Sequence, residues 1–551
     1  MDWYNKTITS AIEKVVEQNP NAEALVRGDQ RVTYEELVNM ASRIASGMKG
    51  LGITSGEHVA ILHPNDIVVQ VLHYASSCLG TVCVPLNVML SPRELRHVLE
   101  HADVKVLFVG GTHKDKPLAE FVLEAVPELR HARDPKLDLS GHPKLKWIVQ
   151  TEPEDFSHDA FLRLNDLEET GTKTPLPFVN QEAKPESISH LLYTSGSTAF
   201  PKGVLLTHRG ILGSAFYWGE ALCVTGTDRC LTLLPYYHTA GLIVQWLDVH
   251  LRGGCVHILK RYHPIDFKEV METVQRERIT VMGAFDPLLK RILEHPERSQ
   301  YDLSSWQKTS SFAGVSYDNR VKAGLSRIVS LYSLTEASNP VTLMMPEERR
   351  YEIRRNSVGR PLPGVEVKIV DPNTEEKLPP GVSGEVRFRG WNRMVGYYKP
   401  GPEESPENVF DKEGFFKTGD RGYLDNEGYL YLQGRYKEMI KSGGENIFPL
   451  EIENFLCNEV PGILLAQVVG VSDDQWGEVV TAFVEVAPGM VYLPQDIIKI
   501  CKDKMASFKV PKHVFLLKSE DWPMTSTAKV RKDELQRRAM GILACQEDKA
   551  I

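Results

Sequence analysis

A hydroxyl-rich loop that contains a lysine is the stretch of this sequence best suited to chemistry. Residues 187–208 read SISHLLYTSGSTAFPKGVLLTH: a β-prone run, small and hydroxylated residues, Lys202, and a second β-prone run. Small residues let backbone N–H groups approach phosphate oxygens, hydroxyls donate hydrogen bonds, and the lysine supplies charge. Pro201 and Gly203 flank the lysine, so this is not a Walker A loop. The segment predicts a strand–loop–strand phosphate site, with an ordinary Ser/Gly turn as the alternative.

A second segment, VSLYSLTE, ends a predicted strand with three side chains suited to a nucleotide. The ring of Tyr332 can stack on a base, the hydroxyl of Thr335 can bind a phosphate, and the carboxylate of Glu336 can hold a cation such as Mg²⁺. Strand ends also carry Thr and Glu for capping, so this pattern alone is weak.

Four other positions carry reactive groups that also have ordinary explanations. Asp420 lies in a tight TGDRG context, where an Asp commonly forms a turn, and Arg435 ends a predicted β-ribbon. His238 follows a strand end in PYYHTAG, where a loop histidine with local hydrogen bonds is equally expected. Lys529 lies in the small, polar run PMTSTAKVRK, where a lysine is ordinarily a solvated surface residue.

The elements that must position these groups follow an α/β pattern. From residue 24 to about 170, helical and strand-like segments alternate, which is typical of a largely parallel sheet. Residues 114–145 look polar and irregular. The expected elements are helix 35–51, strand 57–63, helix 66–79, strand 81–85, helix 92–102 and strand 104–110.

The alternation resumes after the loop, with strands expected at 231–235, 279–284 and 310–315. Residues 357–431 are β-rich and predict a small antiparallel sheet or barrel. After Gly434 a shorter α+β segment follows, with helices expected from about 450 and over 494–505. We therefore expect an α/β protein with an N-terminal domain over residues 1–434 and a C-terminal domain over 435–551.

Composition narrows the class of protein. Among 551 residues, 42% are hydrophobic and 25% are charged, and 64 basic against 73 acidic residues give a net charge of −9. This charge balance gives no basic footprint for nucleic acid. The eight cysteines form no CxxC pair, so neither a zinc site nor a disulfide framework is expected. The first residues favour an amphipathic helix over a signal peptide, and no apolar run suffices to cross a bilayer. A cytoplasmic enzyme is expected, and a homodimer is compatible with the sequence.

Taken in order, the segments resemble the AMP-forming acyl-CoA synthetase family. This family belongs to a superfamily that includes firefly luciferase and the adenylation domains of peptide synthetases. The resemblance extends from about Tyr34 to Lys532 and implies a large N-terminal domain of two α/β subdomains plus a β-barrel, and a small mobile C-terminal domain. It is carried by YTSGSTAFPKG, LPYYHTAG, YSLTE, GEVRFRG, KTGD, GRYKEMIKSGGENI and PMTSTAKVRK.

The resemblance implies a two-step reaction with ATP, Mg²⁺ and coenzyme A. A carboxylate attacks the α-phosphate of ATP to form acyl-AMP and pyrophosphate, and the CoA thiol then attacks acyl-AMP. Lys529 would bridge the carboxylate and the α-phosphate, where it neutralises accumulating charge. Tyr332 would stack near adenine, Asp420 and Arg435 would hold the ribose, and Thr335 would contact the α-phosphate. Phosphate contacts would come from Thr194, Ser195, Gly196, Ser197, Thr198 and Lys202, further nucleotide contacts from Ser333 and Gly314, and metal ligands from Glu336 and Thr198.

The resemblance also implies a hinge near Lys437. The C-terminal domain would rotate there between the two steps, withdraw Lys529, and bring the loop of Lys441 to the site. Gly443 and Gly444 would then let pantetheine pass close to the backbone. His238 would gate the acyl and CoA channels. A compact aryl, alicyclic or short- to medium-chain acid is expected, because Phe312 stands where the family often has glycine. The pocket would be lined by Tyr236, Tyr237, His238, Phe285, Asp286, Phe312, Ala313, Gly314 and the stretch of Ser338, Asn339 and Pro340.

Three residues depart from the family pattern. Ala199, Ser333 and Ala528 stand where the family usually has glycine. A non-glycine residue costs on the order of 1 kcal/mol wherever φ is positive. The changes predict slower adenylation or a preference for the reverse, ATP-forming direction.

Three alternatives remain open at this point. The chain could load a carrier protein in place of CoA, although no carrier domain follows Lys532. It could be a monooxygenase of the luciferase kind, or a degenerate nucleotide-binding protein that has lost turnover. The retained charged residues argue against the degenerate protein.

Overall fold

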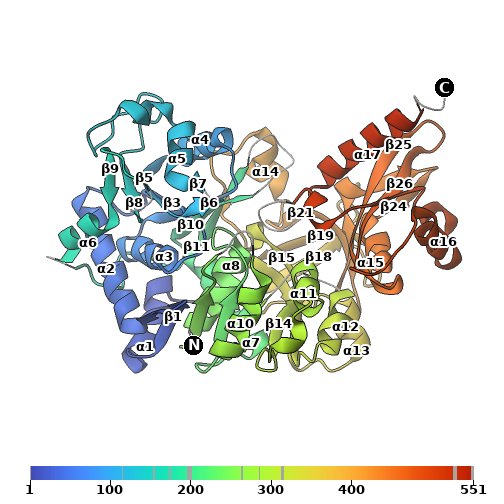
Figure 1. The fold of residues 1–551 in the computed structure, drawn as a ribbon, viewed down its shortest axis with the longest axis horizontal. Helices are drawn as coiled ribbons and strands as arrows, with labels where there is room; N and C mark the ends of the chain where they lie inside the picture. The colour runs from blue at the N-terminus through green and yellow to red at the C-terminus, as the bar shows by residue number, and fades with distance from the viewer. Residues whose placement is uncertain are drawn as a thin grey trace.

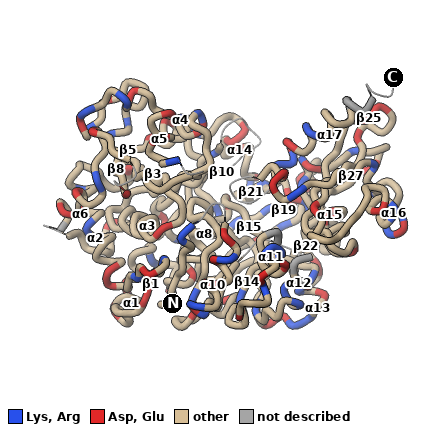
Figure 2. Tube along the Cα trace, in the orientation of Figure 1, with Lys and Arg blue, Asp and Glu red and all other residues tan. Residues whose placement is uncertain are grey.

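The computed structural model describes residues 2–113, 116–152, 156–172, 175–194, 201–261, 265–283, 286–311, 315–524 and 530–547. Figure 1 shows a large N-terminal part of layered α/β structure and a smaller C-terminal part at one end of the molecule. Acidic and basic residues are interspersed over both parts in this view and do not gather on one face (Figure 2). The predicted fold class, α/β with a small C-terminal domain, is confirmed.

The first sheet has eight strands in the order β20-β11-β10-β4-β3-β5-β8-β9. The pairs from β10 to β9 are parallel, and β11 and β20 add antiparallel strands at one edge. The expected strands are present within two residues at either end. The bounds are β3 (His58–Leu62), β4 (Val82–Leu86), β5 (Val104–Val109), β8 (Trp147–Gln150), β9 (Phe161–Arg163), β10 (Ile188–Thr194), β11 (Lys202–Thr207) and β20 (Gly396–Tyr397).

The helices expected at 35–51, 66–79 and 92–102 are present and begin within one residue of the expected starts. Thr33 and Glu36 form a capping box, with each side chain accepting a hydrogen bond from the other residue's backbone N–H. A helix within residues 118–125 replaces the irregular segment expected there, because Leu118, Ala119, Val122 and Ala125 bury one face. The helices are α2 (Tyr34–Gly50), α3 (Ile67–Leu79), α4 (Pro92–His101), α5 (Leu118–Ala125) and α6 (Leu164–Thr172).

A second sheet starts as β2-β1-β13-β12 and continues as β14-β15-β16-β17, joined by single-residue bridges at Val281. The strand expected at 279–284 is reduced to those bridges in its described part. The strands are β1 (Glu23–Arg27), β2 (Gln30–Thr33), β12 (Arg229–Thr232), β13 (Cys255–Ile258), β14 (Lys308–Ser311), β15 (Arg327–Leu334), β16 (Asn339–Leu343) and β17 (Arg360–Pro361). The helices are α1 (Ile8–Gln18), α7 (His208–Leu222), α8 (Thr239–Leu242), α9 (Asp248–His250), α10 (Phe267–Glu277), α11 (Asp286–Leu293), α12 (Val315–Lys322) and α13 (Tyr351–Asn356).

The β-rich segment forms a four-stranded antiparallel sheet in the order β18-β19-β21-β22. The edge strands β18 and β22 do not pair among the described residues, so the predicted barrel is an open sheet. Alternate residues of β19, such as Val386 and Phe388, pack into the main core. The bounds are β18 (Val365–Val370), β19 (Gly384–Gly390), β21 (Phe416–Leu424) and β22 (Leu430–Arg435).

The C-terminal part has its own sheet and its own buried clusters. The sheet runs β24-β23-β26-β25, and β27 pairs with β26. Ile452, Ile497 and Cys501 come from two helices and pack against this sheet. The elements are β23 (Ile440–Ser442), β24 (Glu445–Ile447), α15 (Pro449–Glu459), β25 (Ile463–Asp473), β26 (Gly477–Val486), α16 (Pro494–Lys504), β27 (His513–Leu516) and α17 (Lys532–Glu547).

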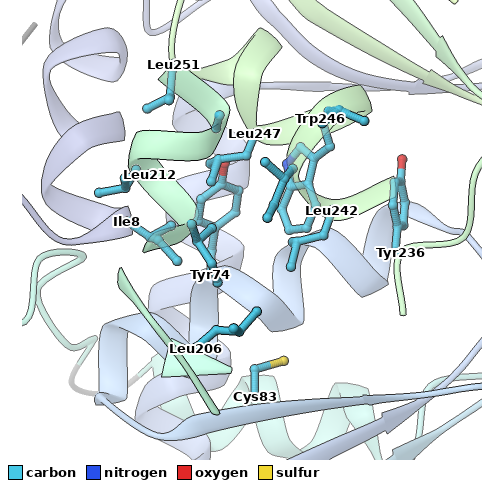
Figure 3. Close-up of a cluster of buried hydrophobic side chains, with 14 of the residues drawn as sticks. Ile8, Tyr74, Cys83, Leu206, Leu212, Tyr236, Leu242, Trp246, Leu247 and Leu251 are labelled. Atoms are coloured by element: carbon cyan, nitrogen blue, oxygen red, sulfur yellow. The ribbon is translucent and has the colours of Figure 1, made fainter. Parts of the chain in front are cut away.

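The main core lies between the two N-terminal sheets. Figure 3 shows Tyr74 of α3, Leu212 of α7 and Trp246 packed together, with Cys83 of β4 at the border of the cluster. Trp246 belongs to a π-helical turn, Ile243–Leu247, that connects α8 to α9. Within the described ranges, no helix combines the length and the apolar character needed to span a membrane.

Candidate active site

The predicted strand–loop–strand is present as an antiparallel hairpin. Thr194 at the end of β10 faces Lys202 at the start of β11. The pair fixes where the intervening loop leaves and re-enters the sheet. The predicted phosphate contacts of that loop lie outside the described residues: Ser195, Gly196, Ser197 and Thr198, together with Ala199.

Lys202 is held by an acidic partner that the sequence did not suggest. Its Nζ lies 2.6 Å from Oε1 of Glu404 and 5.7 Å from the centre of the Tyr397 ring. The hydrogen bond from Lys202 lowers the pKa of the Glu404 carboxyl. The lysine side chain is 20% exposed and that of Glu404 is 12% exposed, so the pair is largely shielded from water.

The Tyr397 hydroxyl connects this ion pair to Glu336. It donates a hydrogen bond to Oε1 of Glu336 at 2.9 Å, and burial and the nearby Glu336 charge raise the pKa of Tyr397. β20 carries Tyr397 and pairs with β11, which carries Lys202. One tyrosine thus lies between a cation suited to a phosphate and a carboxylate suited to a metal ion.

Glu336 itself follows β15 in a short 3-10 turn, Thr335–Ala337, and its carbonyl accepts a hydrogen bond from the Met394 N–H at 2.7 Å. Tyr397 is the one hydrogen-bond donor to its carboxylate among the described residues. A half-buried carboxylate with two oxygens fits an Mg²⁺ ion, because Mg²⁺ binds carboxylate oxygens and keeps several waters. Thr335 is buried beside it, at 9% exposure.

A second group joins three predicted nucleotide-binding residues. Asp420 and Arg435 face each other across β21 and β22. Arg435 Nε lies 2.8 Å from Oδ1 of Asp420, and the Tyr332 hydroxyl donates to Oδ2. Burial raises the pKa of the Asp420 carboxyl, although the Arg435 charge and the Tyr332 hydrogen bond oppose this. Strands β15, β21 and β22 therefore place the ring of Tyr332, the carboxylate of Asp420 and the guanidinium of Arg435 together.

Ser333, one of the departures from the family pattern, causes no backbone strain. It lies in β15 opposite Pro340 and is not among the residues with positive φ. Left-handed backbone occurs instead at Ser338, with φ 50°, and at Asn339, with φ 97°. The other two departures, Ala199 and Ala528, lie outside the described residues.

His238 and Tyr237 lie where β12 leads into α8. His238 is half-buried and caps α8, because its Nδ1 accepts from the Ala240 N–H at 3.2 Å. Tyr237 is 7% exposed. Tyr236, expected in the pocket, is buried in the core, where Gln70 donates to its hydroxyl. Of the other predicted pocket residues, Ser338, Asn339 and Pro340 are buried, and Asp286 begins α11. Four lie outside the described residues: Phe285, Phe312, Ala313 and Gly314.

The predicted CoA-side residues lie on a separate hairpin of the C-terminal sheet. Lys441, Gly443 and Gly444 belong to the β23–β24 hairpin and are exposed. Gly443 has φ +57°, and a Cβ there would approach the Trp476 ring to 2.7 Å, so the position requires glycine. In the described part of the chain, no hydrogen bond or ion pair joins this hairpin to Glu336.

Lys529 lies outside the described residues, but the base of its loop is described. A bridge between Met524 and Val530 closes the loop. Just beyond it, Lys532 forms ion pairs of 2.9 Å with Glu438 and 2.8 Å with Glu453. Glu438 ends the 3-10 turn, Tyr436–Glu438, that follows β22 and contains Lys437, so the predicted catalytic loop is anchored beside the predicted hinge.

Sequence reasoning missed Tyr397, Glu404 and Lys532 as parts of the site. Tyr397 and Glu404 lie in GYYKPGPEE, which shows no local signal for contact with Lys202 or Glu336, because the pairing of β20 with β11 creates that contact. Lys532 ends a motif that was recognised, but its two acidic partners are distant in sequence.

Comparison with known proteins decides the family. The model of the AMP-binding enzyme family matches residues 12–398, and that of the AMP-binding enzyme C-terminal domain matches residues 451–529. The chain belongs to the AMP-binding enzyme family. Its N-terminal match includes Lys202, Glu336 and Tyr397 and ends at Tyr398.

Full-length relatives support this assignment. The chain is 30% identical to a putative acyl-CoA synthetase, YngI, of Bacillus subtilis, with 97% of each chain covered. It is 31% identical to a ligase of Rhodococcus jostii that is named for joining CoA to an octahydroindenyl propanoyl group, over 96% of this chain and 98% of the relative. The fold matches the crystal structure of the anthranilate CoA ligase AuaEII in complex with anthranoyl-AMP, with TM-score 0.83, 23% identity and 98% of each chain covered.

Proposed function

We propose that this protein is an AMP-forming carboxylic acid–CoA ligase. The observation that carries the proposal is the family match over both parts of the chain, together with near-full-length similarity to two proteins named as CoA synthetase or ligase. The geometry supports it, because Lys202 and Glu336 both contact Tyr397 and so lie within one small site.

In the first step, a carboxylate oxygen of the acid attacks the α-phosphorus of ATP. The bond from that phosphorus to the β-phosphate bridge breaks, which gives acyl-AMP and pyrophosphate. Lys202 would bind the phosphates, Thr335 the α-phosphate, and Asp420 with Arg435 the ribose hydroxyls. Lys529 would neutralise the charge that accumulates at the reacting phosphorus.

Glu336, with Thr198, would hold Mg²⁺, which would supply a positive charge beside the phosphates. Tyr397 would position the Glu336 carboxylate through its hydrogen bond to Oε1. The ring of Tyr332 would stack near adenine, and its hydroxyl donates a hydrogen bond that positions Asp420.

In the second step, the CoA sulfur attacks the acyl carbon, loses its proton, and AMP leaves. The C-terminal domain, which we assign to residues 435–551, would rotate near Lys437 to bring the Lys441–Gly444 hairpin to the site. Gly443 and Gly444 would admit pantetheine, and His238 would separate the acyl and CoA channels. A cytoplasmic location fits the composition.

We further propose that the acid is compact: aryl, alicyclic, or a short- to medium-chain fatty acid. The reason is Phe312, because a phenyl ring where the family often has glycine would shorten the acyl pocket. The relative named for an octahydroindenyl propanoyl group acts on an acid with a ring system, which agrees with this class.

The test is release of pyrophosphate from ATP and Mg²⁺ with benzoate, cyclohexanecarboxylate, hexanoate and a long-chain acid, with and without CoA. We expect one compact class to give equal amounts of pyrophosphate, AMP and acyl-CoA. Pyrophosphate release without any thioester would indicate a carrier protein as the acyl acceptor. Faster turnover of the long-chain acid would contradict the compact pocket.

A further inference from the structure

Two histidines and a cysteine converge in the buried core, away from the proposed active site. Within the described ranges they are the single group of three or more His, Cys, Asp or Glu side chains whose ligand atoms all lie within 4.8 Å of one another. His73 comes from α3, Cys83 from β4 and His190 from β10, and none is more than 2% exposed. Three separate elements thus direct nitrogen and sulfur atoms to one point.

The spacing of these atoms is close to the spacing of ligands around one metal ion. His73 Nδ1 lies 3.0 Å from His190 Nε2 and 3.5 Å from Cys83 Sγ. With three ligands in one plane, metal–nitrogen bonds of about 2.0 Å and metal–sulfur bonds of about 2.3 Å give nitrogen–nitrogen separations of roughly 3.5 Å and nitrogen–sulfur separations of roughly 3.7 Å. The two nitrogens would need to move apart by about half an ångström, and His73 Nδ1 and Cys83 Sγ by about 0.2 Å.

One chain of hydrogen bonds links the two histidines when no metal is bound. His73 Nδ1–H donates to the lone pair of His190 Nε2, His190 Nδ1–H donates to Ser189 Oγ at 3.1 Å, and Ser189 Oγ donates to the Leu206 carbonyl. His73 Nε2 is buried without a hydrogen-bond partner. A cation would take the place of the proton between the two rings and add Cys83 Sγ as a third ligand, and Ser189 would fix the ring of His190 as hydrogen-bond partners of metal-bound histidines commonly do.

The surroundings favour a soft cation of low charge. A bound metal removes the proton from a coordinating thiol. With one thiolate and two neutral imidazoles, a divalent ion would leave a net positive charge in the core, whereas a monovalent ion gives a neutral centre.

The available space is also small and apolar. A cavity of about 10 Å³ adjoins His73 and His190 and is closed by side chains such as Leu242 and Trp246. Figure 3 shows Cys83 next to this apolar cluster. A cavity of this size is near the lower limit for one water molecule. Both histidines line it, and Cys83 does not.

We propose that His73, Cys83 and His190 form a three-coordinate site for a soft, monovalent d¹⁰ cation, Cu(I). Thiolate and imidazole are ligands that suit this ion. The site would join α3, β4 and β10 at a point four residues before Thr194. Its role would be to stabilise the strand that leads into the phosphate loop.

The test is Cu(I) binding by the full-length protein without oxygen, in competition with the chromophoric chelator bicinchoninate, with metal content measured by mass spectrometry. Cys83→Ala and His190→Leu remove ligands. Cys78→Ala is the matched control, because Cys78 is a buried cysteine of α3 outside the cluster. X-ray absorption at the copper edge reports the ligands, and thermal unfolding reports stability.

We expect one Cu(I) per chain in the wild type and in Cys78→Ala, a higher melting temperature, and a spectrum with two nitrogen ligands and one sulfur ligand. Cys83→Ala and His190→Leu should lose binding at least tenfold. The proposal is overturned if the wild type binds no Cu(I), a result that does not depend on whether any variant folds. It is also overturned if Cys83→Ala binds as well as the wild type, or if Zn(II) displaces Cu(I) from the site at equal concentration.

Discussion

Lys202 and Glu404 form an ion pair of 2.6 Å at the edge of the proposed phosphate site. If Lys202 binds the phosphates of ATP, Glu404 competes with them for the same ammonium group. The carboxylate thereby holds the lysine in place before ATP binds and must release it when ATP arrives.

Glu404→Gln is therefore expected to lower the KM for ATP by about fivefold, because a largely shielded ion pair of this kind contributes roughly 1 kcal/mol. Steady-state kinetics with ATP varied at saturating acid and CoA would measure this. Glu403→Gln, at the exposed neighbouring position, is the control and should leave KM unchanged. A rise in KM for Glu404→Gln would show that Glu404 assists ATP binding.

Tyr397→Phe should reduce kcat for adenylation by about tenfold and increase the Mg²⁺ concentration needed for half-maximal rate, because it removes the hydrogen bond that positions Glu336. Tyr398→Phe is the matched control, since that hydroxyl donates to Asp103 instead. Equal effects of the two substitutions would argue against a positioning role for Tyr397.

The pH dependence of stability should depend on Glu277, which joins α10 to the second sheet. It accepts from Arg31 at 3.0 Å and from Arg229 at 2.9 Å. Burial disfavours its ionised form, but the arginine hydrogen bonds outweigh this and lower its pKa from 4.5 to about 2. Because the folded-state pKa is depressed, the stabilisation is present above about pH 4.5 and is lost as the pH falls toward 2.

Glu277→Gln should accordingly cost on the order of 2 kcal/mol at pH 7 and less than half of that at pH 3. Melting temperatures measured at the two pH values would show this convergence. Glu272→Gln, an exposed position of the same helix, is the control. A loss that stays the same at both pH values would contradict an ionic origin.

Lys290 connects the two parts of the chain. Its ammonium group donates to the carbonyls of Ile463 at 2.6 Å and Leu464 at 3.1 Å in β25, and the side chain is buried. If the C-terminal part rotates as proposed, these bonds would stabilise one of its placements.

Lys290→Met should therefore change the rate of one half-reaction by about fivefold and leave the rate of the other unchanged within error, because about 1 kcal/mol that favours one placement is lost. Single-turnover formation of acyl-AMP, and of acyl-CoA from purified acyl-AMP, would separate the two steps. Lys14→Met, at an exposed position of α1, serves as the control. Parallel changes in both steps would exclude a role for Lys290 in domain placement.

The sequence predicted the elements around the site better than the contacts within it. Hydrophobic periodicity and the Thr33–Glu36 capping box are local signals, so α2 and β3 were placed within two residues. The proximity of Asp420 to Arg435 follows from a β-ribbon and could be anticipated in part. The Tyr397 contacts could not be anticipated, because they depend on β20 adding to β11 almost two hundred residues earlier in the chain. The left-handed Ser338 and Asn339 also gave no signal, since neither residue is glycine.

The central claim is that an acid and ATP form acyl-AMP with the help of Lys529. The most direct test is exchange of labelled pyrophosphate into ATP, without CoA, in the wild type, in Lys529→Ala, and in Lys518→Ala as a control lysine that precedes the loop. The account predicts acid-dependent exchange in the wild type and in Lys518→Ala, and a loss of at least a hundredfold in Lys529→Ala. Exchange that needs no acid, or that survives unchanged in Lys529→Ala, would contradict it.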